Sequence, residues 1–383
     1  MTSSPLLVIP PEIVSFSFGE SHPFDTRRFS LFLELVRGYG LLQGEDIVSQ
    51  IPDAPFELIE AVHDRDYLER LMEFGREGAG RADFRYGLGD MENPVFPGMY
   101  DWAIRTTSAT LLAARLVASG EVPIAFNPAG GWHHAHRARA SGFSYINDAA
   151  VAITDLLRQG KRVVYLDLDA HHGDGVQEMF YDTDRVLTVS IHESGIYFFP
   201  GTGFVEEIGT GKGEGYSVNV PLRAHTDDPL YMKAFDEVAY PLIAAFDPDI
   251  MVTQIGVDTF RTDPLTNLEI TTHSYAYIMR KLKALRIPWV ALGGGGYDIV
   301  NVARAWTIAW GTMKGVRPDP RLPDSFIRVI RGMGHPHTML LDAMHWALAD
   351  DRFEALDDLE GTIRTIRQLI FPRLIGSHGT ASR

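Results

Sequence analysis

Short apolar runs that end in polar, glycine-rich loops recur along this chain, and they constrain its fold more than any other feature. Five runs are rich in β-branched or large apolar residues: VPIAF from Val122, RVVYLDLD from Arg162, RVLTVSIH from Arg185, DIMVTQIGVD from Asp249 and PWVALGG from Pro288. Strands that are apolar on both faces are typical of parallel sheets covered by helices on both sides. The runs therefore predict a three-layer α/β/α fold with a central, mostly parallel sheet.

Segments with helical spacing of apolar residues separate many of these runs. Residues 147–158 follow one run and residues 229–246 precede another. This alternation of strands and helices favours a doubly wound sheet. Ligands of such sheets bind beyond the carboxyl ends of the strands, where this chain has the loops NPAGGWHHAH, DLDAHHGDG, GVDTFRTDP and GGGGYD. Four polar loops at one predicted edge indicate a functional site there.

The pattern weakens beyond about Gly315. Residues 317–325 predict a proline-rich turn region, 338–348 and 353–369 predict helices, and the tail 376–383 is expected to be mobile. We expect one domain over 1–383, with its core at about 12–315 and a helical segment at about 316–375 packed on that core.

Composition limits what the site could hold and where the protein works. The chain has no cysteine, so a metal would have to be held by His, Asp or Glu. A net charge of −15 argues against tight nucleic-acid binding; it suits a cationic substrate such as a basic peptide tail or a polyamine, or simply keeps the protein soluble. No apolar run is long enough to span a bilayer and the start MTSSPLLVIP lacks a secretory pattern. We therefore expect a cytoplasmic protein with no membrane partner.

Candidate metal ligands stand at the ends of two predicted strands. Asp169 and His171 lie two positions apart after one strand, and Asp258 ends another. Two carboxylates and one imidazole leave coordination positions open, as a catalytic zinc requires. Taken singly, each of these residues is also compatible with a helix cap or a turn hydrogen bond.

Two adjacent histidines, His133 and His134, follow the run from Val122. An imidazole near a metal can take a proton from water, and it needs a partner that fixes its tautomer. Asp167 and Asp174 flank the candidate ligands and could be those partners; Asp167 would lie in a buried strand, where an unpaired carboxylate is costly. Without the other motifs, a polar loop pair of no consequence would be the simpler interpretation.

A turn of four glycines, residues 293–296, precedes Tyr297. It lets the backbone approach a ligand closely, and a phenol aimed at a developing oxyanion would complement a metal. Glycine-rich turns after strands also bind phosphates, but neither GxGxxG nor a P-loop pattern is present.

Together these motifs resemble the histone deacetylase family, most closely its bacterial acetoin-utilisation-type members. The similarity runs from about His22 to Trp310, through GWHHAHRARASGFSYINDAAVAI, VVYLDLDAHHGDGVQEMF, YFFPGTG, QIGVDTFRTDPL and LGGGGYDIVNVARAW. The resemblance implies the arginase–deacetylase fold and a zinc-dependent amidohydrolase that removes acetyl groups from lysine side chains. It further implies one catalytic Zn²⁺, with Fe²⁺ as an alternative, structural K⁺, and an acetylated protein or peptide substrate, for which an acyl-CoA synthetase is a family-based candidate.

The resemblance also assigns roles to residues of this sequence. Zinc ligands would be Asp169, His171 and Asp258. His134 with Asp174 would act as general base and then acid, His133 with Asp167 would give electrostatic support, and Tyr297 would polarise the acyl carbonyl. The remaining matches are the tunnel walls Phe143 and Phe199 with Gly142 beside them, the rim residues Leu265 and Glu92, Arg28 near a channel for acetate release, and a potassium site at Asp167, Asp169, His171, Ser190 and Ile191.

Two departures from the family pattern bear on the substrate. The family usually has an aspartate at the tunnel rim, whereas the match here is Glu92, with Asp90 nearby. The loop before the tandem histidines reads PAGGW, which fits bacterial members better than the proline-rich eukaryotic version.

Three alternatives were weighed against this interpretation. A two-manganese ureohydrolase would need carboxylates at Gly173 and Phe260, and we reject it. An acetylpolyamine amidohydrolase performs the same chemistry on a small cation and is compatible with Glu92 and the acidic charge, although no obvious insertion narrows the rim before Phe96. A non-catalytic acyl-lysine-binding protein would require a broken motif, and none is broken. The physiological substrate, acyl chain length, native metal and oligomeric state are not fixed by the sequence.

Overall fold

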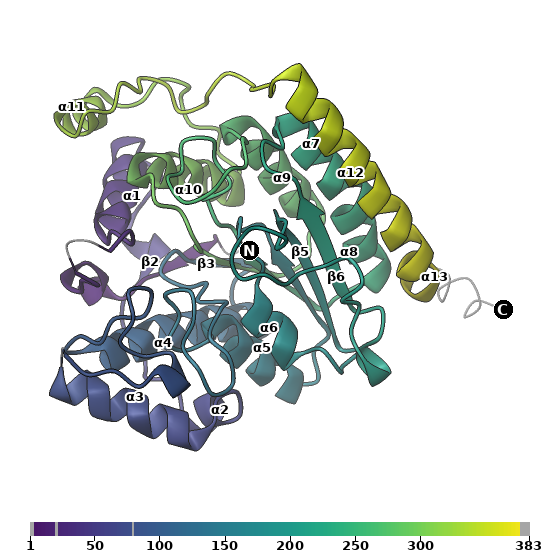
Figure 1. Cartoon of the computed structure of the whole chain (residues 1–383). Helices are drawn as coiled ribbons and strands as arrows, with labels where there is room; N and C mark the ends of the chain where they lie inside the picture. Colours follow the sequence, from purple (N-terminus) through teal and green to yellow (C-terminus); the bar gives the residue numbers. More distant parts are fainter. Residues whose placement is uncertain (1–3, 20–21, 79, 376–383) are drawn as a thin grey trace.

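Eight parallel strands form the centre of the molecule (Figure 1). The computed structural model describes residues 4–19, 22–78 and 80–375, so the predicted mobile tail at 376–383 lies outside the described residues. The strands are β1 (Leu6–Val8), β2 (Ile47–Val48), β3 (Ile124–Asn127), β4 (Val163–Asp167), β5 (Val186–Glu193), β6 (Ser217–Leu222), β7 (Ile250–Gln254) and β8 (Trp289–Leu292).

The strands are ordered β2-β1-β3-β8-β7-β4-β5-β6, and every neighbouring pair runs parallel. The strand β4 lies between β7 and β5, with Asp167 opposite Ser190 of β5 and Gln254 of β7. All residues of β3, β4, β5, β7 and β8 are buried. The expected parallel sheet with both faces covered is confirmed.

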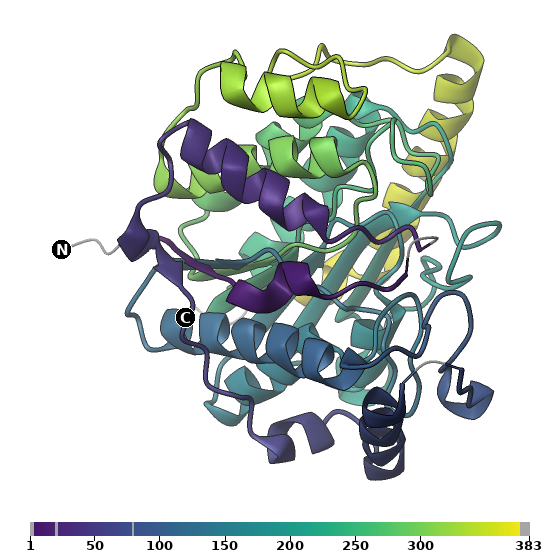
Figure 2. The same cartoon turned by 90° about the vertical axis from the view of Figure 1, so that its left-hand side faces the viewer.

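Helices cover both faces of the sheet. They are α1 (Arg27–Gly38), α2 (Phe56–Glu60), α3 (Arg65–Glu77), α4 (Met99–Ala118), α5 (Asp148–Arg158), α6 (Asp174–Met179), α7 (Asp228–Ala234), α8 (Tyr240–Phe246), α9 (Thr272–Ala284), α10 (Ile299–Lys314), α11 (Asp324–Gly332), α12 (Ala349–Leu369) and α13 (Phe371–Leu374). One layer contains α1, α9 and α10, and the opposite layer contains α4 and α5 (Figures 1 and 2). The predicted three-layer α/β/α architecture is thus present.

Local capping explains where two of the predicted helices begin. The Asn147 side chain accepts a hydrogen bond from the backbone N–H of Ala150 at 3.0 Å and so caps α5. The predicted helix over 229–246 contains α7, α8 and a π-helical turn at Phe235–Ala239 between them. Asp227 caps its start by accepting from Leu230 N at 3.2 Å.

Five strands were predicted, and all five occur where the apolar runs stand. The prediction missed β1 and β2, which have only three and two residues. It also missed β6, an edge strand that carries Ser217, Asn219 and Pro221, because polar residues and proline are tolerated at a sheet edge. The helix α11 was not predicted either.

The helix predicted over residues 338–348 is wrong, because this segment is irregular and has no helix. Backbone N–H groups of this segment donate hydrogen bonds to acceptors elsewhere in the chain. The N–H of His345 donates to Asp228 at 3.1 Å and that of Ala347 to Asp227 at 3.2 Å. These buried carboxylates need donors, and the irregular segment supplies backbone N–H groups that a helix would use within itself. The helix predicted over 353–369 lies within α12, which packs on β6 and α7.

None of the helices in the described part of the chain has the length and hydropathy that crossing a membrane requires.

Candidate active site

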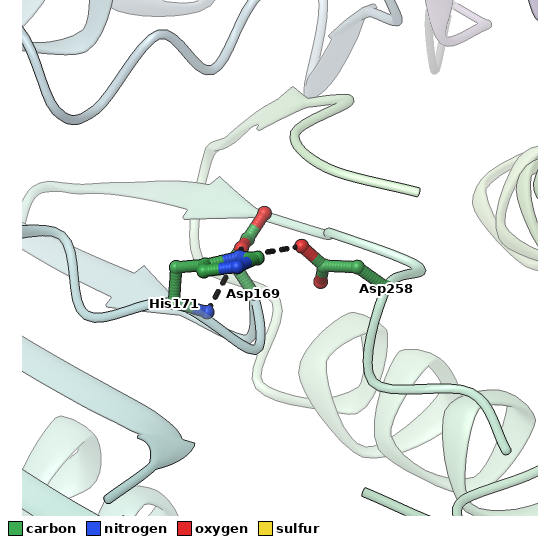
Figure 3. A group of neighbouring side chains, drawn as sticks. All are labelled: Asp169, His171 and Asp258. Atoms are coloured by element: carbon green, nitrogen blue, oxygen red, sulfur yellow. Dashed lines mark hydrogen bonds and ion pairs between the residues drawn. The ribbon is translucent and has the colours of Figure 1, made fainter. Parts of the chain in front are cut away.

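Three candidate metal ligands meet at the carboxyl edge of the sheet (Figure 3). Asp169 and His171 follow β4, and Asp258 follows β7, the next strand in the sheet. The Nδ1 atom of His171 lies 3.1 Å from Oδ1 of Asp169 and 2.9 Å from Oδ2 of Asp258. One ligand atom from each of the three residues lies within 4.8 Å of the others; both aspartates are buried, and the His171 side chain is 11% exposed.

Backbone donors fix both carboxylates of this cluster. The N–H of Gly295, in the glycine-rich turn, donates to Oδ2 of Asp169 at 2.7 Å. The N–H of Ala170 donates to Oδ1 of Asp258 at 2.8 Å. A Cβ atom on Gly295 would lie only 2.2 Å from Oδ2 of Asp258, so this position has room for glycine alone. The turn predicted to approach a ligand closely therefore touches the cluster.

The cluster carries more negative charge than a buried site tolerates alone. Burial and then the charge of Asp169 raise the pKa of Asp258, which reaches about 8. Burial lowers the pKa of His171, but the two carboxylates outweigh it and raise the value well above normal. A cation among these atoms would relieve the repulsion, and the set of two oxygens and one nitrogen suits a zinc-type ion.

Each of the two adjacent histidines donates to its own aspartate. His133 Nδ1 lies 2.7 Å from Oδ2 of Asp167, and we call these two residues the sheet pair because Asp167 ends β4. His134 Nδ1 lies 2.7 Å from Oδ1 of Asp174, and we call these the helix pair because Asp174 begins α6. Because a carboxylate only accepts, Nδ1 carries the proton in both rings and Nε2 is left for chemistry.

The two histidines differ in their affinity for protons. Burial lowers the pKa of His133, but the charges of Asp167 and Asp169 outweigh this and raise it to about 9. Burial and the neighbouring charge of His133 lower the pKa of His134 to about 4, despite Asp174. Of the two, His134 is therefore the ring that is neutral at pH 7 and able to accept a proton.

Tyr297 is held at the end of the glycine-rich turn. Its backbone N–H donates to Oδ2 of Asp263 at 2.7 Å, and the other oxygen of Asp263 accepts from Leu265 N at 3.0 Å. Burial and the nearby carboxylates raise the pKa of Tyr297 well above its usual range, so the phenol keeps its proton. Asp263 was not predicted as a site residue, and it ties the phenol to the rim residue Leu265.

A single cavity of about 330 Å³ joins the predicted tunnel residues to the cluster. Phe143 and Phe199 line it from two sides: Phe143 stands edge-on to Tyr297 at 5.8 Å, and Phe199 stands edge-on to His134 at 5.0 Å. The other predicted residues on its wall are Glu92, His133, Gly142, Asp169, His171 and Leu265. Phe143 has φ of 66°, an unusual value for a bulky residue that marks a tightly determined site.

The structure separates the two acidic candidates at the mouth of this cavity. Asp90 faces its own turn, where its Oδ1 accepts from Glu92 N at 3.0 Å and Asn93 N at 2.6 Å. Glu92 lines the cavity, and burial and the charge of Asp90 raise its pKa. His22, which was not predicted as a site residue, contacts the Glu92 carbonyl at 3.2 Å and the Phe143 ring at 4.5 Å. Of these two carboxylates, Glu92 and not Asp90 therefore lines the cavity.

Arg28 lies behind the glycine-rich turn, fully buried. Its two terminal nitrogens donate to the carbonyls of Gly296, at 2.9 Å, and Gly294. Its Nε has no hydrogen-bond partner among the described residues, and its guanidinium stacks on Phe24 and Trp306 at 4.7 Å. These contacts hold the turn; the acetate channel predicted for Arg28 stays a prediction.

Of the five residues predicted to bind potassium, the structure relates Asp167 and Ser190 most directly. Ser190 is opposite Asp167 in the parallel register, and Ile191 follows it on β5. Asp167 and Ser190 both line a small cavity of about 10 Å³ behind the metal cluster, large enough for about one water-sized particle. The Ser190 hydroxyl contacts His192 Nδ1 at 2.8 Å.

Three further residues at the cavity or the cluster were missed from the sequence. Phe198 stacks on His171 at 4.8 Å, Trp132 lines the cavity, and Gln254 donates through Nε2 to the Gly131 carbonyl at 2.8 Å. Trp132 adjoins the predicted histidines and Phe198 adjoins Phe199, so adjacency in sequence was the available signal. Gln254 ends a buried strand at the same sheet edge, where a buried amide needs partners.

A parallel α/β sheet with a buried carboxylate–imidazole cluster, two histidine–aspartate pairs and a phenol at one apolar-walled cavity defines a class of metal-site hydrolases. Comparison with known proteins is consistent with that class. The family model described as the histone deacetylase domain matches residues 22–313. This chain belongs to the histone deacetylase family.

Curated relatives come from bacteria, fungi and animals. The acetoin utilization protein AcuC of Bacillus subtilis is 41% identical over 331 residues, which is 84% of this chain and 85% of the relative. Histone deacetylase 8 of Xenopus tropicalis is 39% identical over 78% of this chain and 81% of its own length, and histone deacetylase RPD3 of Saccharomyces cerevisiae is 37% identical over 82% and 72%. These relatives support a deacetylase-type hydrolase.

Solved structures give the same fold. The crystal structure of an HDAC homolog complexed with SAHA superposes with a TM-score of 0.86 at 33% identity, covering 94% of this chain and all of that one. An HDAC homolog from Aquifex aeolicus superposes with a TM-score of 0.81 at 31% identity and the same coverage. The arginase–deacetylase fold expected from the sequence is confirmed.

Proposed function

We propose that this protein is a zinc-dependent lysine deacylase that hydrolyses the acetyl amide of lysine side chains in proteins or peptides. The observation that carries the proposal is the narrow aromatic-walled cavity, which ends at the cluster of Asp169, His171 and Asp258. An acyl-lysine has a long apolar stem and a polar amide at its end, and a tunnel between Phe143 and Phe199 suits that shape.

The metal would be bound by Asp169, His171 and Asp258, whose donor atoms and excess negative charge fit Zn²⁺ and also allow Fe²⁺. When bound there, such an ion supplies Lewis-acid polarisation of the amide carbonyl and lowers the pKa of water. The structural K⁺ expected near Asp167 and Ser190 would add positive charge beneath the same ligands.

The remaining chemistry comes from side chains of this protein. His134, neutral at pH 7 and oriented by Asp174, accepts the proton of the attacking water through Nε2 and returns it to the departing lysine amine. His133, cationic beside Asp167, gives electrostatic support to the developing negative charge. The Tyr297 phenol keeps its proton and donates it in a hydrogen bond to the oxyanion.

The substrate enters at the rim formed by Glu92 and Leu265. Glu92 would accept hydrogen bonds from the backbone N–H groups of a peptide that carries the acyl-lysine. Arg28 would receive acetate behind the glycine-rich turn. The whole chain, 1–383, would act as one catalytic domain, with the helical segment at about 316–375 packed on its core. An acylated acyl-CoA synthetase is a candidate partner.

The test is deacetylation of an acetyl-lysine peptide by the zinc-loaded chain, with a zinc-free preparation alongside. We expect hydrolysis that depends on the metal and that a hydroxamate chelator abolishes. Metal binding without hydrolysis of acetyl-lysine or longer acyl-lysine peptides would contradict the lysine deacylase proposal.

An acetylpolyamine amidohydrolase is the second candidate, because the Glu92 carboxylate at the cavity mouth would attract a free ammonium group. The two candidates separate on kcat/KM for N-acetylputrescine against an acetyl-lysine peptide in the same assay. We expect the peptide to be preferred, and a higher kcat/KM for the polyamine would replace the first proposal by the second.

A further inference from the structure

A third histidine of the same loop, His136, contacts the aspartate of the helix pair. Its Nε2 atom lies 3.3 Å from Oδ2 of Asp174, at ion-pair distance although not aligned as a hydrogen bond. The other oxygen of the same carboxylate, Oδ1, accepts from His134 Nδ1 at 2.7 Å. Asp174 therefore lies between two imidazoles, one in the active site and one toward solvent.

On its outer side His136 pairs with a second carboxylate. Its Nδ1 contacts Oε2 of Glu178 in a short charge-assisted contact. Asp174 and Glu178 both lie on α6, four residues apart, so they face the ring from one side of the same helix. The side chain of His136 is 19% exposed and that of Glu178 is 50% exposed. The contacts thus run from the buried His134 to the surface.

Two carboxylates favour the charged form of the His136 ring. Burial lowers the pKa of His136, but the negative charges of Asp174 and Glu178, together with the hydrogen bond to Glu178, outweigh it and raise the pKa to about 9. The other ionisable groups nearby are Arg137 on the same loop, whose charge acts on Glu178, and His63 after α2. Burial lowers the pKa of His63 to about 4, so this ring adds no positive charge at neutral pH.

The backbone of His136 is fixed, so its ring cannot drift from Asp174 easily. Its N–H donates to the Arg139 carbonyl at 2.9 Å. Its carbonyl accepts from His63 Nδ1 at 2.9 Å, and the preceding carbonyl of Ala135 accepts from Asn147 Nδ2 at 3.1 Å. The sheet pair is built differently, because Asp167 is held by the Tyr165 hydroxyl at 2.8 Å, a neutral donor.

We propose that His136 is a positioning residue that, as a cation braced by Glu178, holds Asp174 in the orientation that directs His134. The inference rests on the proposed function, in which His134 transfers the proton. Without the cation, Asp174 would keep its hydrogen bond to His134 but lose the positive charge that restrains its second oxygen. The His134 ring would then be held less firmly in the orientation that proton transfer requires.

The first test measures the ionisation of His136 and needs no activity. Zinc-loaded, full-length protein labelled with ¹³C at histidine is titrated by NMR, and the His136 resonance is assigned from its loss in His136→Gln. We expect a pKa more than about one unit above the ordinary value near 6.5, falling in Glu178→Gln. A pKa at or below the ordinary value would overturn the proposal.

The second test separates positioning from general stability. His136→Gln should lower kcat by about 10–100-fold and leave KM unchanged, because His136 is not on the wall of the substrate cavity. His136→Lys, which keeps a cation facing Asp174, should recover most of kcat. The matched control is His225→Gln, which removes a histidine paired with Glu269 at 2.7 Å on the surface, and it should change neither constant.

Unchanged kcat in His136→Gln, or no recovery in His136→Lys when both variants melt like the wild type, would contradict a positioning role. If the wild-type protein hydrolyses no acyl amine at all, the proposed function fails. The NMR titration then decides the inference alone: a raised pKa that depends on Glu178 supports it and an ordinary pKa overturns it.

Discussion

The sheet pair and the helix pair begin at neighbouring histidines but end in different parts of the fold. His133 reaches Asp167 at the end of a buried central strand, and His134 reaches Asp174 at the start of a short helix near the surface. The two hydrogen bonds have the same length, 2.7 Å. Similar local geometry therefore does not give similar chemistry.

The surroundings of the two pairs explain the difference. Burial lowers the pKa of His133, but the two buried carboxylates that it faces, Asp167 and Asp169, outweigh this and raise the pKa to about 9. Burial and then the charge of His133 lower the pKa of His134 to about 4, although Asp174 acts in the opposite direction. In the proposed function one ring would serve as a fixed charge and the other as a proton acceptor, a division that pairs of titratable groups in active sites commonly show.

The largest difference in kcat between the two pairs is expected when the imidazole of His134 or that of His133 is removed. His134→Asn should reduce kcat by about 10²–10⁴-fold, the usual contribution of a general base. His133→Asn should cost less, about 10–100-fold, because it removes support and not the proton acceptor. Steady-state kinetics of both zinc-loaded variants on one acetyl-lysine peptide measure the contrast. Equal losses in the two variants would mean that the pairs do not divide the roles.

Tyr297→Phe removes a group that belongs to neither pair, so its loss of kcat is a reference for the losses expected in the two pairs. Losing one donor to the oxyanion should reduce kcat by about 10²–10³-fold, while zinc content and melting temperature stay unchanged. The measurement is kcat together with the zinc-to-protein ratio. Turnover near the wild-type level would remove Tyr297 from the mechanism.

The aspartates should separate the pairs on stability as well as rate. Asp167 is fully buried and Asp174 is next to the surface, so both Asn variants should lose about 10–100-fold in kcat, but only Asp167→Asn should also lower the unfolding midpoint clearly. Chemical denaturation of the two variants provides the check. A larger loss of stability in Asp174→Asn would reverse the assignment of buried and peripheral pairs.

The smallest expected effect is a pH dependence of stability that arises from His63, which binds the carbonyl of His136 in the loop of the helix pair. Burial lowers the pKa of His63 to about 4 from 6.5 in the unfolded chain. A lowered folded pKa gives stability that is complete above about pH 6.5 and is lost as the pH falls toward 4, by at most about 3 kcal/mol. Between pH 8 and pH 5, the free energy of unfolding should fall less in His63→Gln than in the wild type. Parallel curves for the two proteins would show that His63 does not titrate as described.

The strand ends and their polar loops were predictable because central parallel strands are apolar on both faces. The runs at 163–167 and 250–254 are recognisable as strands from their apolar residues alone. Because each run ends shortly before an aspartate, Asp169 and Asp258 could be placed at the edge of the sheet. The strands β1 and β2 carried no such pattern because they are too short to show one. The irregular segment at 338–348 was predicted as a helix because the spacing of its apolar residues is helical. The carboxylates that accept hydrogen bonds from its backbone lie more than a hundred residues away in the sequence.

The candidate site was predictable as a set of residues but not as an electrostatic arrangement. The family resemblance favoured Glu92 as the rim residue, with Asp90 nearby, and only the folded turn shows that Asp90 accepts from backbone N–H groups while Glu92 lines the cavity. The same holds for His136, whose contact with Asp174 arises because the loop after β3 packs against α6. Contacts between distant loops depend on the tertiary fold and leave no local signature.

The central claim is that this site hydrolyses the amide of acyl-lysine. The most direct measurement is the stoichiometry of acetate and free lysine amine released from one acetyl-lysine peptide by the zinc-loaded chain. We predict one acetate for each lysine uncovered, with no release when Tyr297→Phe and a hydroxamate chelator are combined. A chain that binds zinc yet releases neither product from acetyl-lysine or longer acyl-lysine peptides would contradict the claim.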